Sequence, residues 1–168
     1  SSVGRRIDWV VFNDDKPIGM IGIGSSVYPP PKDILKHTKL SIKEYKNKFN
    51  SFANNWRFCM REKIRNAGTQ ILKELRRQAP LYWKQKYNDD LLYLITFVAG
   101  GNNGAVYKAD NWSQIGKTSG LPPHKSISMK WDTHESLKEK YVKPTGENRK
   151  LIFFKRIRTK QEHISTKT

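Results

Sequence analysis

The sequence has one cysteine, few acidic residues and no long apolar run, and each shortage excludes a class of protein. Cys59 alone cannot form an internal disulfide or supply the several thiolates of a structural zinc site, and it suits a reducing cytoplasm. No run of roughly 18 apolar residues is present, so we expect no transmembrane helix and no membrane partner. The sequence also lacks a P-loop, a Gly-x-Ser-x-Gly turn and a His-Glu-x-x-His helix. The four histidines have no metal-binding spacing: His37, His124, His134 and His163.

Basic residues are abundant. Lys and Arg number 32 against 15 acidic residues, which gives a net charge of +17 and predicts a polyanionic partner. Nucleic acid and an anionic membrane face are the two classes that such a charge suits, and we expect nucleic acid rather than a membrane. Because 36% of the residues are hydrophobic and 11% aromatic, a disordered basic tail is excluded. The length of 168 residues predicts a single domain, with a core over residues 1–158 and a frayed basic tail over 159–168.

Hydrophobic periodicity predicts strands that alternate with helices after an antiparallel start. We expect strands at residues 7–12, 17–24, 54–60, 91–98, 129–131 and 151–154. We expect helical segments at residues 32–48, 61–78, 81–87, 105–112 and 135–141, with a break at Pro80 and a loop at 116–120. This order predicts an α/β protein with a mixed α+β sheet flanked by helices.

The strongest site candidate follows the apolar strand at residues 91–98. A Gly/Asn cluster closes that strand, and within a dozen further positions come Tyr107, Asp110, Asn111, Trp112 and Thr118. Such polar chemistry just after a buried strand indicates a ligand site, with glycines that let the backbone approach a ligand closely. The alternative is a core strand and a structural loop in which the aromatic rings only pack.

Basic residues with interleaved aromatics predict a surface that follows phosphates and stacks on bases. The alternative is a solvated helix face over core aromatics. The predicted nucleic-acid contacts are Arg57, Arg61, Arg76, Arg77, Lys117, Arg156 and Arg158, with Trp56, Tyr82 and Trp83 among the basic residues as candidate stacking platforms.

The segment at residues 65–69 stands where a phosphate-binding loop would open a helix. The order of elements resembles the Gcn5-related N-acetyltransferase (GNAT) fold, whose Arg/Gln-x-x-Gly-x-Gly/Ala loop cradles the pyrophosphate of acyl-CoA. The resemblance implies acyl-CoA contacts at Arg65, Asn66, Ala67, Gly68 and Thr69, although only one glycine of the pattern is present. It also implies that Tyr107 protonates a departing thiolate.

A closer resemblance covers residues 54–120. Four motifs carry it, in the order Asn55-Trp56-Arg57-Phe58, residues 94–99, residues 104–112 and residues 116–120. These are similar to DruA-type domains of Druantia anti-phage systems and, more distantly, to Mom-type phage proteins that modify adenine in DNA. Two departures stand out: Ala99 replaces the Asp of the pattern, and the His-Tyr motif that precedes the first hairpin is absent.

The resemblance implies a DNA-modifying transferase of a phage, mobile element or defence system, in the cytoplasm of a bacterium or infected host. Its GNAT-like domain would span residues 1–168 and lack N-terminal elements, as the start at Ser1 without Met also suggests. The expected catalytic residues are Tyr107, Asn111, Trp112 and Thr118, the expected partner is duplex DNA, and the implied cofactors are acyl-CoA or Fe2+, with Tyr107 and Asp110 as metal candidates. The competing hypotheses are a non-catalytic DNA-binding subunit and an acyltransferase for small molecules or proteins.

Overall fold

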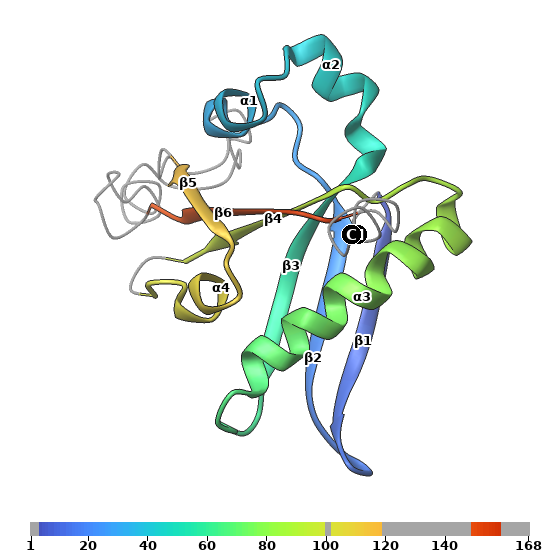
Figure 1. The fold of residues 1–168 in the computed structure, drawn as a ribbon, viewed down its shortest axis with the longest axis vertical. Helices are drawn as coiled ribbons and strands as arrows, with labels where there is room; N and C mark the ends of the chain where they lie inside the picture. Colours follow the sequence, from blue (N-terminus) through green and yellow to red (C-terminus); the bar gives the residue numbers. More distant parts are fainter. Residues whose placement is uncertain (1–3, 100–101, 119–148, 159–168) are drawn as a thin grey trace, which may run out of the picture.

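The described part of the chain forms a mixed six-stranded sheet with helices on both faces, as expected (Figure 1). The computed structural model describes residues 4–99, 102–118 and 149–158. The strand order is β1-β2-β3-β4-β6-β5, in which β3 and β4 are parallel and the other neighbours antiparallel. None of the helices in these ranges is long and apolar enough to cross a membrane.

The first two strands form the predicted hairpin. β1 (Arg6–Asn13) and β2 (Lys16–Ser25) pair antiparallel, and β2 pairs in turn with β3 (Phe52–Met60). The connection from β2 to β3 carries two short helices, α1 (Lys32–Thr38) and α2 (Ile42–Asn47), followed by the 3-10 turn η1 (Phe49–Ser51). A capping box at Ser41 and Glu44 begins α2. The prediction of one or two helices at residues 32–48 is therefore confirmed.

One continuous helix, α3 (Ala67–Tyr87), crosses a face of the hairpin and β3. The predicted start at residue 61 is wrong, because Asn66 adopts a left-handed conformation that ends the preceding loop. The predicted break at Pro80 is also wrong. Loss of a backbone hydrogen bond at proline costs about 3 kcal/mol. Continuing the helix keeps its buried apolar face intact on both sides of Pro80, and each fully buried apolar side chain contributes about 1.5–3 kcal/mol. That face consists of Leu72, Leu75, Ala79 and Trp83.

The second half of the sheet contains β4 (Tyr93–Val98), β6 (Leu151–Arg156) and β5 (Ser113–Lys117), with α4 (Ala105–Ala109) between β4 and β5. The loop predicted from residue 116 is wrong in part, since residues 116–117 continue β5 and pair with β6. The partner strand, β6, lies more than thirty positions further along the sequence, and the local hydrophobic pattern does not reveal such a pairing. The strand predicted at 129–131, the helix at 135–141 and the tail at 159–168 lie outside the described residues.

Alternation along β4 and β6 produces two apolar cores, one on each face of the sheet. The larger core joins α3 and α4 to Leu94, Val98 and Phe153. The smaller core joins α1 and α2 to Phe52, Ile95 and Phe154. Covered on both faces, the middle of the sheet is a rigid frame for the elements that carry the candidate site.

Candidate functional site

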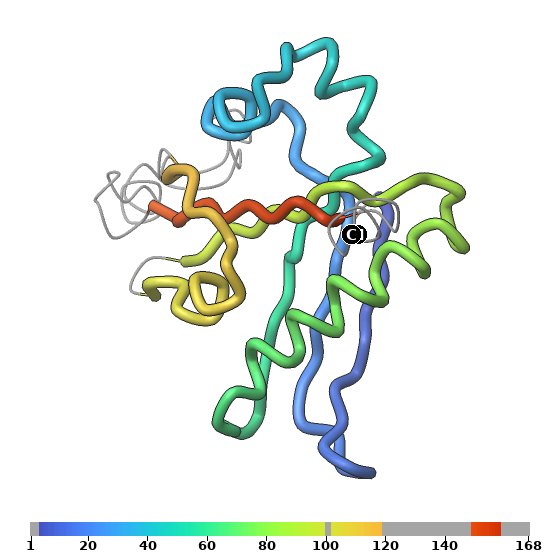
Figure 2. The backbone as a smooth tube through the Cα atoms, in the orientation of Figure 1, coloured from blue at the N-terminus to red at the C-terminus, as the bar shows by residue number. Residues whose placement is uncertain are grey.

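The sheet opens between its two parallel strands. β3 and β4 pair only over Phe52–Asn54 and Tyr93–Ile95. Beyond that point β3 follows the hairpin down the view while β4 and β6 run across it, so the two halves of the sheet diverge (Figures 1 and 2).

A β-bulge in β3 lies at the point of divergence. Gly22 pairs with Arg57 and Gly24 with Asn54, so two residues of β3 stand opposite one of β2. The Thr96 hydroxyl of β4 donates to the Asn55 carbonyl over 2.8 Å. A bulge bends its strand and is common beside active sites. The opening is therefore built into the strand pairing.

Tyr107 points from α4 toward this opening. Its hydroxyl donates to Asn55 Oδ1 at 2.6 Å, and Asn55 Nδ2 donates to the carbonyls of Gly22 and Arg57 at 2.8 and 3.0 Å. These three bonds fix the orientation of the Asn55 amide, which is 3% exposed. Burial raises the pKa of the Tyr107 hydroxyl, so the group holds its proton at neutral pH.

A glycine places α4 close to the sheet. Gly104 caps α4 in the left-handed conformation (φ +68°), and a Cβ there would collide with the ring of Phe153. Tyr107 stacks on the same Phe153 ring, with centroids 5.7 Å apart. The glycine-rich turn noted in the sequence therefore allows the Tyr107 ring to approach the sheet.

Asp110 ends α4 and is almost fully buried. Arg76 of α3 binds its carboxylate in a bidentate pair at 2.7 and 2.9 Å, and Trp112 Nε1 donates to the same carboxylate at 2.8 Å. Trp112 also packs edge-on against Tyr107, with ring centroids 4.9 Å apart. The structure thus brings Tyr107, Trp112 and Asp110 together, with Asp110 tied to Arg76.

The other two predicted catalytic residues contact different groups. Asn111 is exposed in a left-handed conformation, and its carbonyl accepts a hydrogen bond from Lys155 at 3.2 Å. Thr118 follows β5, where it exchanges hydrogen bonds with the backbone of Lys150. Neither has a hydrogen bond to the Tyr107–Asn55 pair among the described contacts. Their predicted roles in substrate positioning stay predictions.

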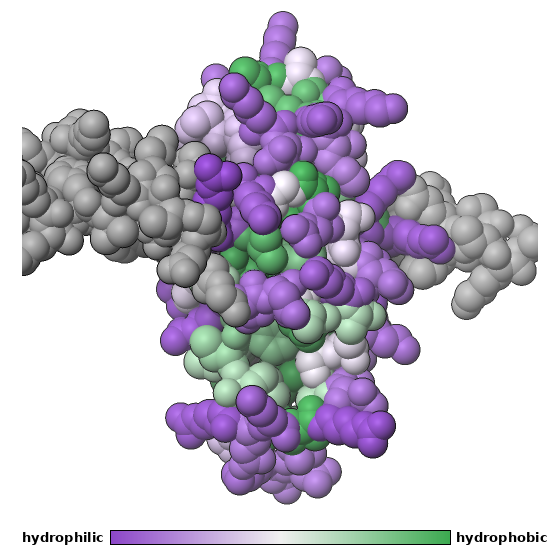
Figure 3. Space-filling model, turned by 90° about the vertical axis from the view of Figure 1, so that its left-hand side faces the viewer, coloured by the Kyte–Doolittle hydropathy of each residue, from purple (hydrophilic) through white to green (hydrophobic). Residues whose placement is uncertain are grey.

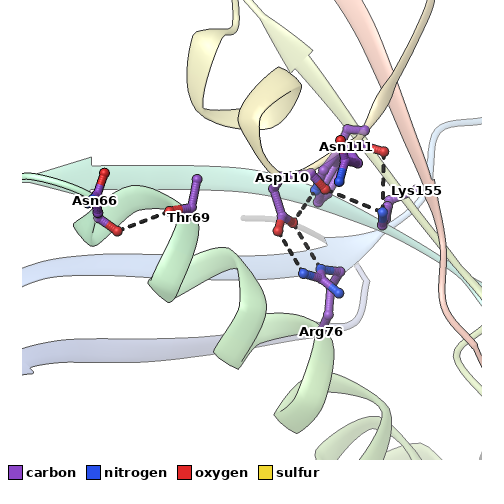
Figure 4. A network of polar contacts seen from close by, with 7 residues as sticks. Asn66, Thr69, Arg76, Asp110, Asn111 and Lys155 are labelled. Atoms are coloured by element: carbon purple, nitrogen blue, oxygen red, sulfur yellow. Dashed lines mark hydrogen bonds and ion pairs between the residues drawn. The ribbon is translucent and has the colours of Figure 1, made fainter.

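The predicted acyl-CoA loop lies at the start of α3. No side chain caps the helix, and its first turn holds no acidic residue, so its amides face no competing carboxylate there. Thr69 Oγ1 donates to the Asn66 carbonyl at 3.1 Å (Figure 4). Gly68 has a packing reason of its own, because a Cβ there would lie 2.5 Å from Val106 Cγ2 of α4. Arg65 precedes this turn and is exposed.

The predicted metal site has few donors. Among the described residues no three His, Cys, Asp or Glu side chains converge. Asp110 is occupied by Arg76 and Trp112, and His37 packs edge-on against Phe154 with centroids 4.7 Å apart. His124, His134 and His163 lie outside the described residues. Nothing in this arrangement supports Fe2+.

The predicted nucleic-acid residues separate into groups. Arg57 lies over the exposed ring of Trp56, with 5.6 Å between its guanidinium and the ring centroid. Arg61 is exposed just after β3, and Lys117 is exposed on β5. Trp83, a candidate stacking platform, is wholly buried, so that expectation is wrong: its indole donates to the Asn50 carbonyl. The remaining arginines line one cavity: Arg76, Arg77, Arg156 and Arg158.

The most informative residues that the sequence did not single out are Asn55 and Thr96. Both belong to motifs quoted above. Their contacts depend on long-range hydrogen bonds: Tyr107 bonds to Asn55 across 52 positions, and Thr96 bonds to Asn55 across 41 positions. A polar residue inside an otherwise apolar strand, as Thr96 is, was the available signal.

Comparisons with known proteins find structural similarity only: no family model and no curated protein matches. The PaiA N-acetyltransferase of Thermoplasma acidophilum, solved with coenzyme A, is 15% identical with a TM-score of 0.44, over 90% of this chain and 61% of that one. A GNAT-family acetyltransferase of Streptococcus pneumoniae is 13% identical with a TM-score of 0.49, over 91% and 68%. An acetyltransferase of Thermus thermophilus is 16% identical with a TM-score of 0.42, over 90% and 64%. The chain thus spans between 61% and 68% of the length of these three structures.

Proposed function

We propose that this chain is a transferase that modifies a base of DNA, with the Tyr107 hydroxyl as the proton donor. The observation that carries the proposal is the position of that hydroxyl, held by Asn55 where β3 and β4 diverge. Burial raises the pKa of this hydroxyl, so the group is protonated at neutral pH, which is the state that a proton donor requires.

Acyl-CoA fits this site as the donor. When bound, it would supply an acyl group activated as a thioester. At the start of α3 the Ala67 amide already donates to the Ile64 carbonyl. The amides of Gly68 and Thr69, together with the positive end of the helix dipole, would therefore hold its phosphates. Tyr107 would keep a proton at its hydroxyl oxygen for the sulfur that leaves.

DNA is the proposed acceptor for two reasons. The charge of +17 exceeds what solubility requires. The motifs at residues 54–120 resemble DruA-type domains of anti-phage systems and, more distantly, Mom-type phage proteins that modify adenine in DNA. Access to a base atom requires the base to leave the duplex. Trp56 is exposed on the β3 bulge, and the Arg6 guanidinium lies over its ring at 4.2 Å from the centroid, so an aromatic side chain and a cation stand together where a nucleic acid could meet both. The proposed setting is the cytoplasm of a bacterium or of a phage-infected cell.

Mass spectrometry of nucleosides tests the proposal. DNA from cells that express the gene should contain a modified deoxyadenosine, whereas DNA from cells with the Tyr107→Phe variant should not. Unmodified DNA from the active gene would exclude the enzyme.

The second candidate is a non-catalytic DNA-binding subunit. Two observations favour it: Ala99 stands where the resembling family has Asp, and the Asp110 carboxylate is fully engaged by Arg76 and Trp112. This candidate predicts that the wild type and the Tyr107→Phe variant both bind DNA, and that DNA from cells with either protein contains no modified nucleoside.

A further inference from the structure

We propose that the cavity between α3 and the end of β6 is a binding site for a backbone phosphate of DNA, one that anchors the strand beside the Tyr107 site. The inference rests on the proposed function, since it names the surface that would hold DNA, the proposed substrate. We call this cavity the phosphate cavity. Its cationic lining residues are Lys73, Arg76, Arg77, Lys155, Arg156 and Arg158, and Ile157 is the other lining residue.

The phosphate cavity brings together two basic segments about eighty positions apart in the sequence. Three cations come from successive turns of α3 and three from β6 and the residues just after it, around a volume of about 420 Å³. Cations repel one another, and this concentration is unfavourable without anions. Arg77 has a partner in Glu74, an exposed pair at 2.8 Å. The two basic segments therefore form a site for a ligand with at least one negative charge.

Arg76 is the fixed donor of the phosphate cavity. Its side chain is 30% exposed, and the bidentate pair with Asp110, 6% exposed, holds the guanidinium in place (Figure 4). The bonds to Asp110 use Nε and one terminal nitrogen, which leaves the guanidinium with further N–H donors. A prepositioned guanidinium loses little conformational entropy when it binds phosphate.

Lys155 shows how crowded the positive charge is. Its ammonium donates to the carbonyls of Asp110 and Asn111 at 3.3 and 3.2 Å (Figure 4). Burial lowers the pKa of Lys155, and Arg76 and Arg158 lower it further, while Asp110 opposes them. A bound phosphate would offset this repulsion and favour the charged form.

Asp110 connects the phosphate cavity to the candidate catalytic residue. It follows α4 directly, three positions after Tyr107, and its amide donates to the Val106 carbonyl. A strand anchored at Arg76 would therefore lie beside the element that carries Tyr107. Hydrophilic side chains also surround the apolar areas on the face drawn in Figure 3. Exposed cations lie outside the phosphate cavity as well, for example Lys43 and Lys46 of α2. The test must therefore control for total charge.

The test compares two double variants with the same loss of charge. Lys73→Gln with Arg158→Gln removes two exposed cations of the phosphate cavity, and Lys43→Gln with Lys46→Gln removes two exposed cations of α2. Affinity for a short DNA duplex is measured by fluorescence anisotropy over a range of salt. If each cavity cation neutralises one phosphate, the slope of log affinity against log salt falls by about 1.8, and affinity at 0.1 M salt falls about 60-fold. The α2 variant should keep the wild-type slope within about 0.5.

Three results separate the alternatives. Equal losses in the two double variants would overturn the proposal, because they would show a general charge effect. Displacement of DNA from the wild type by free coenzyme A would also overturn it, because the cavity would then hold the phosphates of the donor. A selective loss in the cavity variant supports the site even if the wild type modifies no DNA. Modified DNA together with unchanged binding by the cavity variant would sink this site and leave the proposed function standing.

Discussion

At the scale of the residue, the Tyr107 hydroxyl decides between the two candidate functions. Tyr107→Phe keeps the ring that stacks on Phe153 and removes the donor to Asn55. We expect about 10²–10⁴-fold less modification activity, since that is the usual contribution of a general acid. The free energy of unfolding should fall by about 1–3 kcal/mol because Asn55 Oδ1 loses its donor in a buried position. Single-turnover assays and urea unfolding measure the two effects.

Thr96→Val is the matched control. It removes the hydroxyl that donates to the Asn55 carbonyl and that opposes the burial-raised pKa of Tyr107, at a similar cost in stability, while the Tyr107 hydroxyl stays. This variant should remain active. Equal activity of Tyr107→Phe and wild type would show that the hydroxyl only satisfies Asn55.

Two buried tyrosines predict a loss of stability at alkaline pH. Burial raises the pKa of Tyr45 and of Tyr107, whereas an unfolded tyrosine ionises near pH 10. The stabilisation is complete below about pH 10, and it is lost as the pH rises through the folded pKa values, because the unfolded state releases its protons first. Urea unfolding between pH 9 and pH 11 measures the slope, which should be shallower in Tyr45→Phe. An identical slope in that variant would assign the effect to other groups.

At the scale of the element, the contact between α3 and α4 depends on Gly68. In a helix, Gly→Ala ordinarily stabilises a protein by about 0.5–1 kcal/mol. Here the new Cβ would lie 2.5 Å from Val106 Cγ2, and the stiff β-branched side chain cannot easily move aside. We therefore expect Gly68→Ala to destabilise the protein by about 1–3 kcal/mol, the usual cost of overpacking.

Thermal unfolding of the single and double variants checks this contact. In the Val106→Ala background the same Gly68→Ala change should become neutral or stabilising, because the obstructing methyl group is gone. Stabilisation by Gly68→Ala in the wild-type background would mean that α4 does not pack on α3 as described.

At the scale of the whole molecule, the charge of +17 predicts strongly salt-dependent binding to duplex DNA. Contacts to four phosphates would give a slope of about −3.6 in log affinity against log salt, hence about a 150-fold loss between 50 and 200 mM salt. Electrophoretic mobility shift or anisotropy titrations would reveal it. Affinity that hardly changes over that range would remove nucleic acid as the partner. Equal affinity for heparin would reduce the prediction to a general polyanion surface.

The sequence by itself determined most of the local structure. Alternating and continuous apolar runs predicted the hairpin, β4 and β6, and the Gly/Asn cluster predicted the turn before α4. The error in the start of α3 has a local cause, the left-handed Asn66, whereas the continuity of the helix through Pro80 depends on tertiary burial on both sides of that residue. Composition fixed the charge, and the motifs identified Tyr107 and its neighbours as the region of interest.

Only the tertiary structure decided which distant residues meet. The bond from Tyr107 to Asn55, the pair of Arg76 with Asp110, and the joining of α3 and β6 cations in one cavity link positions 34 to 85 residues apart. These contacts depend on which strands pair and where they diverge. A period-two pattern shows which face of a strand is buried, but it does not identify the neighbouring strand or the point at which pairing ends. The burial of Trp83 follows from the same packing: Trp83 lies four positions after Ala79 on the buried face of α3, which only the continuous helix through Pro80 brings into line.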